Sequence, residues 1–72
     1  MTNDINDLVG KRVTHVHRQH PGYIGTVTEV LAGCNPLIRV KFDGLEFSSW
    51  MPPQDLAFCG GGQRISAWLE VA

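Results

Sequence analysis

Features of secreted, membrane-bound and catalytic proteins are scarce in this sequence. Its 72 residues include only two cysteines, Cys34 and Cys59, which are too few for the disulfide framework of a small secreted domain. No apolar run approaches the roughly 18 residues of a membrane span, and no signal-peptide pattern opens the chain. We therefore expect a cytoplasmic protein that does not contact a membrane.

An excess of charge of one sign is also lacking. Six Lys and Arg residues against seven Asp and Glu residues give a net charge of -1, so the chain as a whole is not built to bind a polyanion. The length allows one domain. A domain this short buries only about 60% of the surface that its unfolded chain exposes, so its core is marginal and a partner subunit would help to stabilise it.

Catalytic signatures are missing as well. The sequence contains no Ser/His/acid set, no Gly-x-Ser-x-Gly element, no phosphate-cradling loop and no pair of carboxylates at a telling spacing. We expect no enzymatic activity and no cofactor. Because so small a chain has little concave surface of its own, an enzyme of this size would need a site between subunits.

The sequence does contain a series of short strand patterns separated by turns. Five strands are expected, at residues 12–17, 24–31, 37–42, 45–51 and 56–58. In residues 37–42 the apolar side chains alternate with Arg39 and Lys41, which predicts one buried face and one outward face. The predicted fold class is therefore mainly all-β, as a small five-stranded barrel.

Proline and glycine mark the breaks between these strands. His20-Pro21-Gly22 predicts a turn, and Asp43-Gly44 is typical of a two-residue type I′ hairpin, which requires positive φ. Pro52-Pro53 lacks N–H donors, so we expect a 3₁₀ turn there before the last strand. Gly25 lies inside a predicted strand and indicates a bend or a close backbone approach. In residues 12–17 the apolar spacing breaks strict alternation, which predicts a bulge or a bend.

Both ends of the chain admit two interpretations. Residues 1–10 form either a frayed tail or a single helical turn through Ile5 and Leu8, with Thr2-Asn3-Asp4 as its cap. Residues 63–72 fit either a helix or a strand, and the helix is slightly favoured. The expected organisation is an N-terminal tail at 1–10, a barrel at 11–59, and a glycine hinge with a C-terminal segment at 60–72.

The C-terminal segment carries large apolar side chains beyond the Gly60-Gly61-Gly62 hinge. These are Ile65, Trp68, Leu69 and Val71. Left exposed, they would promote association, so the segment either caps its own barrel or docks on a neighbouring subunit. Because the core is marginal, we expect a homo-oligomer.

Two stretches resemble small β-barrel families. Residues 22–30, Gly-Tyr-Ile-Gly-Thr-Val-Thr-Glu-Val, resemble the KOW element, a Gly-x-x-Gly-x-Val pattern that bends between two strands. Residues 38–44 and the closing Trp50-Met51-Pro52-x-x-x-Leu56 are similar to later strands of SH3-like barrels. The resemblance covers residues 10 to 58 and implies an SH3-like fold. It does not imply one activity, since ribosomal KOW proteins, Tudor and chromo-barrel modules, nitrile hydratase β subunits and type II dihydrofolate reductases share these features.

Three histidines form a possible metal site. His15 and His17 on one strand would share a face, about 6.6 Å apart, a spacing that can share a tetrahedral zinc ion with His20. The alternative is that these are surface histidines and that Cys34 and Cys59 are small apolar packing groups. Since the sequence has no Cys-x-x-Cys pair, we expect no metal.

Basic residues favour a second possibility, nucleic-acid binding. Lys11, Arg12 and Arg18 lie in a stretch without acids, and outward-facing residues of the third strand extend the stripe. The candidate contacts are Lys11, Arg12, Arg18, Arg39 and Lys41, with Tyr23 available to stack on a base.

Aromatic residues favour a protein partner instead. An aromatic groove between loops is how SH3-like barrels often bind, and the candidates here are Tyr23, Phe47, Trp50 and Trp68. Tyr23 lies in a predicted turn and is expected to be the most exposed, whereas Phe42, Phe58 and Trp50 are also candidates for the core. The sequence therefore predicts a non-catalytic, protein-binding or regulatory module, with a KOW-like nucleic-acid module as the alternative.

Overall fold

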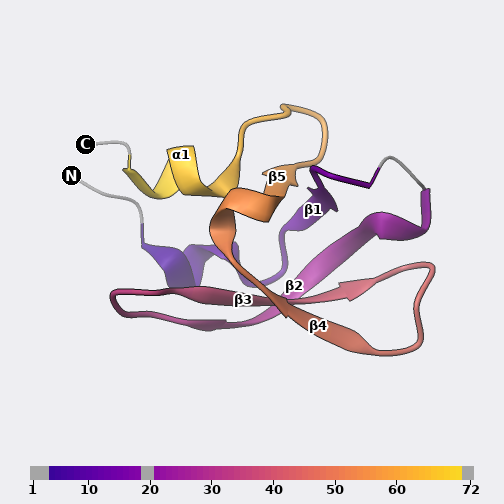
Figure 1. Cartoon of the computed structure of the whole chain (residues 1–72), viewed down its shortest axis with the longest axis horizontal. Helices are drawn as coiled ribbons and strands as arrows, with labels where there is room; N and C mark the ends of the chain where they lie inside the picture. Colours follow the sequence, from indigo (N-terminus) through magenta and orange to yellow (C-terminus); the bar gives the residue numbers. More distant parts are fainter. Residues whose placement is uncertain (1–3, 19–20, 71–72) are drawn as a thin grey trace.

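A computed structural model describes residues 4–18 and 21–70 of the chain (Figure 1). It is mostly β, with five antiparallel strands in one sheet and one short C-terminal helix, so the predicted fold class is confirmed. The elements in chain order are η1 (Ile5–Leu8), β1 (Arg12–His15), η2 (Pro21–Tyr23), β2 (Ile24–Leu31), β3 (Leu37–Phe42), β4 (Ser48–Met51), η3 (Pro53–Asp55), β5 (Leu56–Phe58) and α1 (Ile65–Glu70).

The sheet has the order β4-β3-β2-β1-β5, so β4 and β5 form its edges among the described residues. Gly25 sits where β2 crosses β3 most closely. A Cβ there would lie 2.5 Å from the carbonyl oxygen of Lys41 and 2.8 Å from the Cα of Phe42. The close backbone approach expected at Gly25 is therefore confirmed. The expected bulge lies not in β1 but in β2, between Val27 and Glu29, and β1 ends at His15 in a turn.

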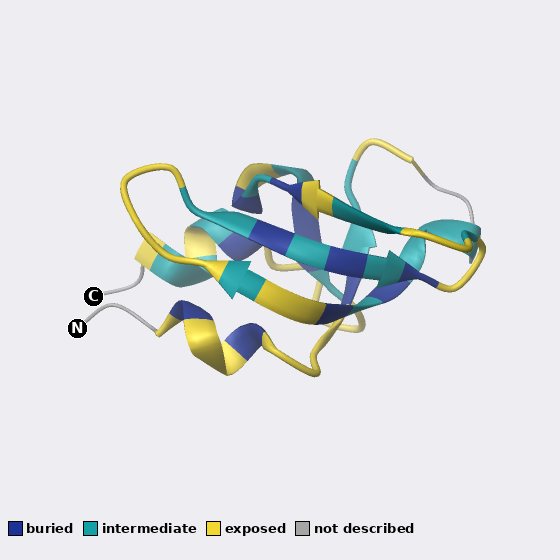
Figure 2. Ribbon diagram, turned by 90° about the horizontal axis from the view of Figure 1, so that it is seen from below, coloured by how far each residue is buried: buried dark blue, intermediate teal, exposed yellow. Residues whose placement is uncertain are grey.

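The core lies on one face of this sheet. Ile38, Val40 and Phe42 point into it from β3, as predicted, and buried residues alternate with half-exposed ones along the strand (Figure 2). Both short flanking elements add to it. The fully or almost fully buried apolar residues are Ile5, Leu8, Val13, Val27, Ile38, Val40, Phe42, Met51, Leu56, Ala57 and Ile65.

At the N-terminus, the helical-turn interpretation is the one observed. The side chain of Asp4 accepts a hydrogen bond of 2.9 Å from the backbone N–H of Asn6, which caps the 3₁₀ turn η1. This turn brings Ile5 and Leu8, three residues apart, onto the core with exposed fractions of 9% and 0%. Ile5 and Leu8 are thus part of the packed core, whereas Asn6 and Asp7 are exposed.

The prediction of a type I′ turn at Asp43-Gly44 is wrong. The connection between β3 and β4 spans residues 43–47, and Gly44 is not among the glycines with positive φ. A hydrogen bond of 3.1 Å from Leu45 N–H to the Phe42 carbonyl closes the turn. Long-range contacts set its conformation, since the Gly44 N–H donates to the Gly22 carbonyl at 3.1 Å. As a result, β4 begins at Ser48 and not at residue 45.

The C-terminal segment forms a helix that packs on its own sheet (Figure 1). Ile65 is completely buried, and the Trp68 ring meets the Phe58 ring edge-on with centroids 5.6 Å apart. Residues 59–64 turn back so that the Phe58 N–H donates to the Gln63 carbonyl at 2.9 Å. Of the two alternatives for this segment, packing on its own chain is observed. The homo-oligomer was expected because the core of so short a chain is marginal, and it stays a prediction.

None of the helices in residues 4–18 and 21–70 has the length and apolar character needed to cross a membrane.

Candidate functional site

Trp50 stands on the outer face of the sheet, away from the core. It lies on the edge strand β4 directly opposite Arg39 of β3, and Arg39 in turn lies opposite Glu29 of β2. The guanidinium of Arg39 lies 6.0 Å from the centre of the Trp50 ring and donates to the Glu29 carboxylate at 3.0 Å. Arg39 is thereby held between a carboxylate and an aromatic ring, and Trp50 remains 41% exposed.

The same face carries further exposed apolar surface. Leu31 is 53% exposed and pairs across the strands with the half-buried Leu37, which is the diagonal neighbour of Trp50. We call Leu31, Leu37 and Trp50 the outer apolar strip. Because the opposite face supplies the core, the strip lies outside the core cluster, and the recorded ring contact of Trp50 is with the Arg39 guanidinium.

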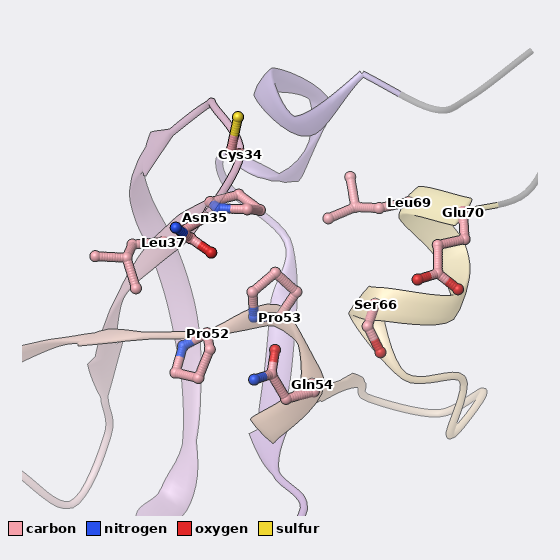
Figure 3. A pocket seen from close by; sticks show the side chains of 10 residues that line it. Cys34, Asn35, Leu37, Pro52, Pro53, Gln54, Ser66, Leu69 and Glu70 are labelled. Carbon is pink, nitrogen blue, oxygen red and sulfur yellow. The ribbon is translucent and has the colours of Figure 1, made fainter.

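A groove of about 350 Å³ adjoins the strip at Leu37 (Figure 3). Its walls come from three segments that are distant in sequence: the β2–β3 turn, the Pro52-Pro53 region with η3, and α1. The prolines end the ladder of β4 and turn the chain away from β3, which leaves space beside Leu37. The described lining residues are Cys34, Asn35, Pro36, Leu37, Pro52, Pro53, Gln54, Ser66, Leu69 and Glu70.

Most cationic side chains of the sheet form hydrogen bonds or ion pairs with other residues of the chain. Arg12 forms a two-pronged contact with Asp43, with N to O distances of 2.6 and 3.1 Å. The hydrogen bond lowers the pKa of Asp43 and raises the pKa of Arg12. Lys41 donates to the carbonyls of Phe42 and Leu45, which pins the start of the β3–β4 connection.

The five predicted nucleic-acid contacts therefore do not form one free basic stripe. Arg12, Arg39 and Lys41 lie on the outer face, each with a partner inside the chain. Arg18 lies elsewhere, over the Tyr23 ring at 5.3 Å. Lys11 is exposed beside β1.

The four aromatic residues predicted to bind a partner are also separated. Phe47 and Trp50 are exposed, and Phe47 is 64% exposed in the β3–β4 connection. The expectation that Tyr23 is the most exposed aromatic is wrong, because its ring packs edge-on against Phe42 at 5.6 Å and against His15. Trp68 packs against the core through α1, and core packing of Trp50 is not observed.

His15 and His17 lie side by side at the end of β1, with ring centroids 5.8 Å apart. The backbone N–H of His17 donates to Nδ1 of His15 at 3.1 Å, and Nε2 of His17 lies 3.2 Å from the Asp55 carboxylate. Burial lowers the pKa of His15. His20 lies outside the described residues, and among the residues described no group of three or more metal-ligating side chains comes together. Cys34 and Cys59 are both exposed, so their expected role as packing groups is wrong.

Sequence reasoning missed the groove. Its residues come from three separate segments, and no local pattern relates Leu37 to Leu69 and Glu70. The one available signal was the Pro52-Pro53 pair, which marks the point where β4 must end. Comparison with known protein families, with curated proteins and with solved structures finds no match to this chain.

Proposed function

We propose that this chain is a small non-catalytic module that binds a protein partner through the outer apolar strip and the adjoining groove. One observation carries the proposal: Trp50, a residue type that dominates interface energetics, is 41% exposed on an edge strand beside other exposed apolar side chains. A partly exposed tryptophan stabilises the fold of a free domain less than it would stabilise a complex in which a partner buries it.

The chemistry of the groove supports a binding role over a catalytic one. Its described lining residues include a thiol, Cys34, and a carboxylate, Glu70, with no histidine, lysine or arginine beside them. A nucleophilic mechanism needs a base within hydrogen-bond reach of the nucleophile, and the Cys34 thiol and the Glu70 carboxylate lie on opposite sides of the groove (Figure 3). Apolar walls with amide side chains at the rim suit the docking of a polypeptide.

Nucleic-acid binding is the second candidate, favoured by the position of Arg12, Arg39 and Lys41 on the same face as Trp50. Phosphate contacts require free cations. Two of these three are already paired with the carboxylates of Asp43 and Glu29, so a phosphate would have to displace them. This is why the protein partner is preferred.

The test is affinity capture with the full chain as bait, using an extract of the organism that encodes it. The Trp50→Ala variant is compared with the wild type, and Val9→Ala serves as the control because Val9 is also exposed, at 51%, but lies after η1. We expect a protein that the wild type and Val9→Ala both retain and that Trp50→Ala loses by about tenfold or more in affinity.

Nuclease treatment and salt separate the two candidates. Retention that survives nuclease supports the protein partner. The protein-partner proposal is overturned in favour of nucleic acid if nuclease abolishes retention and DNA or RNA oligomers bind the chain. That binding should weaken steeply above about 50 mM salt. Equal retention by wild type and Trp50→Ala also overturns the proposal.

A further inference from the structure

The groove has a chemical asymmetry that points to one class of partner. Its floor and walls are apolar, with Leu37 and the two prolines on one side and Leu69 on the other (Figure 3). Asn35, Gln54 and Ser66 add polar groups that can exchange hydrogen bonds with a peptide backbone. At about 350 Å³ the space matches the lower end of small-ligand pockets, enough for one or two side chains of an inserted segment.

Charge at the groove has one sign. Glu70 is the only charged residue among the described lining residues. Its carboxylate forms no ion pair with any residue in 4–18 or 21–70, in contrast to Asp43 and Glu29 on the sheet, which are both paired with arginines.

A ligand complementary to this groove therefore carries a positive charge next to an apolar group. An anionic ligand placed there would meet the Glu70 carboxylate with no compensating cation, and a neutral apolar ligand would leave that carboxylate partly desolvated. We propose that the groove binds a peptide segment in which a Lys or Arg residue flanks one or two apolar residues. The apolar side chains occupy the space between Leu37 and Leu69, and the cation pairs with Glu70. This inference rests on the proposed function and names the chemistry of its partner.

Selection from a random peptide display library against the immobilised full chain tests the inference. We expect enriched peptides to carry Lys or Arg next to apolar residues. The two cysteines provide a site-specific readout, since Cys34 lines the groove and Cys59 is exposed at the end of β5. A Cys59→Ser protein labelled at Cys34 with an environment-sensitive fluorophore reports groove occupancy, and a Cys34→Ser protein labelled at Cys59 is the control.

A matched pair of charge variants then isolates the cation contact. Glu70→Gln and Glu46→Gln each remove one exposed carboxylate, but Glu46 lies in the β3–β4 connection and does not line the groove. For a selected peptide we expect Glu70→Gln to weaken binding about two- to fivefold, as for an exposed ion pair. Glu46→Gln should leave binding within about 1.5-fold, the change expected at a more distant charge screened by salt.

Each outcome separates this inference from the function on which it depends. Peptides that shift the Cys34 label but show no basic preference, with equal effects of both Glu variants, overturn the inference and leave the binding module intact. The same holds if no peptide is enriched while Trp50-dependent capture of a protein persists. A DNA oligomer that shifts the Cys34 label overturns the inference, and loss of Trp50-dependent capture overturns the proposed function itself.

Discussion

The two ends of the sheet are built on different principles. At the end that holds the β3–β4 connection, backbone lies directly on backbone, because Gly44 meets Gly22 and Gly25 meets β3. The Arg12–Asp43 ion pair closes the same end. At the opposite end, around Leu37 and α1, a groove stays open and a carboxylate has no described partner. The first end is held by backbone contacts and an ion pair, whereas the second end packs α1 on the core and leaves the groove open beside it.

The largest loss of stability is expected for side chains added at the two closely packed glycines of the closed end, Gly25 and Gly44. In Gly25→Val a new Cβ would lie 2.5 Å from the Lys41 carbonyl oxygen, and in Gly44→Val it would lie 2.4 Å from the Gly22 Cα. Both neighbours are backbone and cannot rotate away, so each variant should lose about 3 kcal/mol or more of its free energy of unfolding. Urea denaturation measures the loss.

Gly61→Ala is the control for both glycine variants, since nothing lies within 4 Å of the position that its Cβ would occupy and its φ is not positive. It should change stability by no more than about 0.5 kcal/mol. A similar loss in Gly61→Ala, or intact stability in Gly44→Val, would remove the distinction between the two ends.

The next prediction concerns the helix that forms one wall of the groove. Ile65→Ala should cost about 2–4 kcal/mol, because Ile65 is fully buried and its truncation leaves a cavity. Truncation after Gly61 should destabilise the chain further without altering its association state, since α1 packs on its own sheet. Light scattering beside urea denaturation checks both. A full-length oligomer that becomes monomeric on truncation would show that the segment mediates association instead.

The sequence predicts the strands better than it predicts the two ends of the sheet, for a physical reason. Strand periodicity is local, so β2, β3 and β5 could be placed at their observed bounds from residues such as Ile38, Val40 and Phe42. The turn at Gly44 was located but given the wrong conformation, because Gly22, far away in sequence, sets its geometry. The groove depends on α1 meeting the Pro52-Pro53 region, and that contact has no local signature. Tyr23 was misjudged likewise, since a turn residue is buried only by what packs on it from elsewhere.

A smaller effect on stability is expected on the outer strip. Trp50→Ala should lower the free energy of unfolding by less than about 1 kcal/mol, because the side chain packs on one side only and remains 41% exposed. The same variant is expected to lose partner binding about tenfold. The contrast with Val40→Ala, on the neighbouring strand but fully buried, should be clear in urea denaturation, with a loss of about 1–3 kcal/mol. Comparable losses in the two variants would mean that Trp50 serves the fold.

The smallest effect is a pH dependence at His15, near the closed end. Burial, and to a lesser degree the positive charge of Arg18 and His17, lowers the pKa of His15 in the folded chain, while Asp55 opposes the shift. The unfolded chain therefore binds more protons than the folded chain below the ordinary value of 6.5, and stability should fall as the pH drops below that value. The hydrogen bond from the His17 N–H to Nδ1 acts in the same direction, because a protonated Nδ1 cannot accept it.

His15→Asn keeps an acceptor near the position of Nδ1 but does not titrate, so it should flatten the stability profile between about pH 7.5 and 5. His17→Asn, which retains His15, should keep the slope. Urea denaturation at several pH values measures both, and the NMR titration of the His15 ring gives its midpoint directly. A midpoint at or above the ordinary value would show that His15 is open to solvent and that Tyr23 and Phe42 do not enclose it.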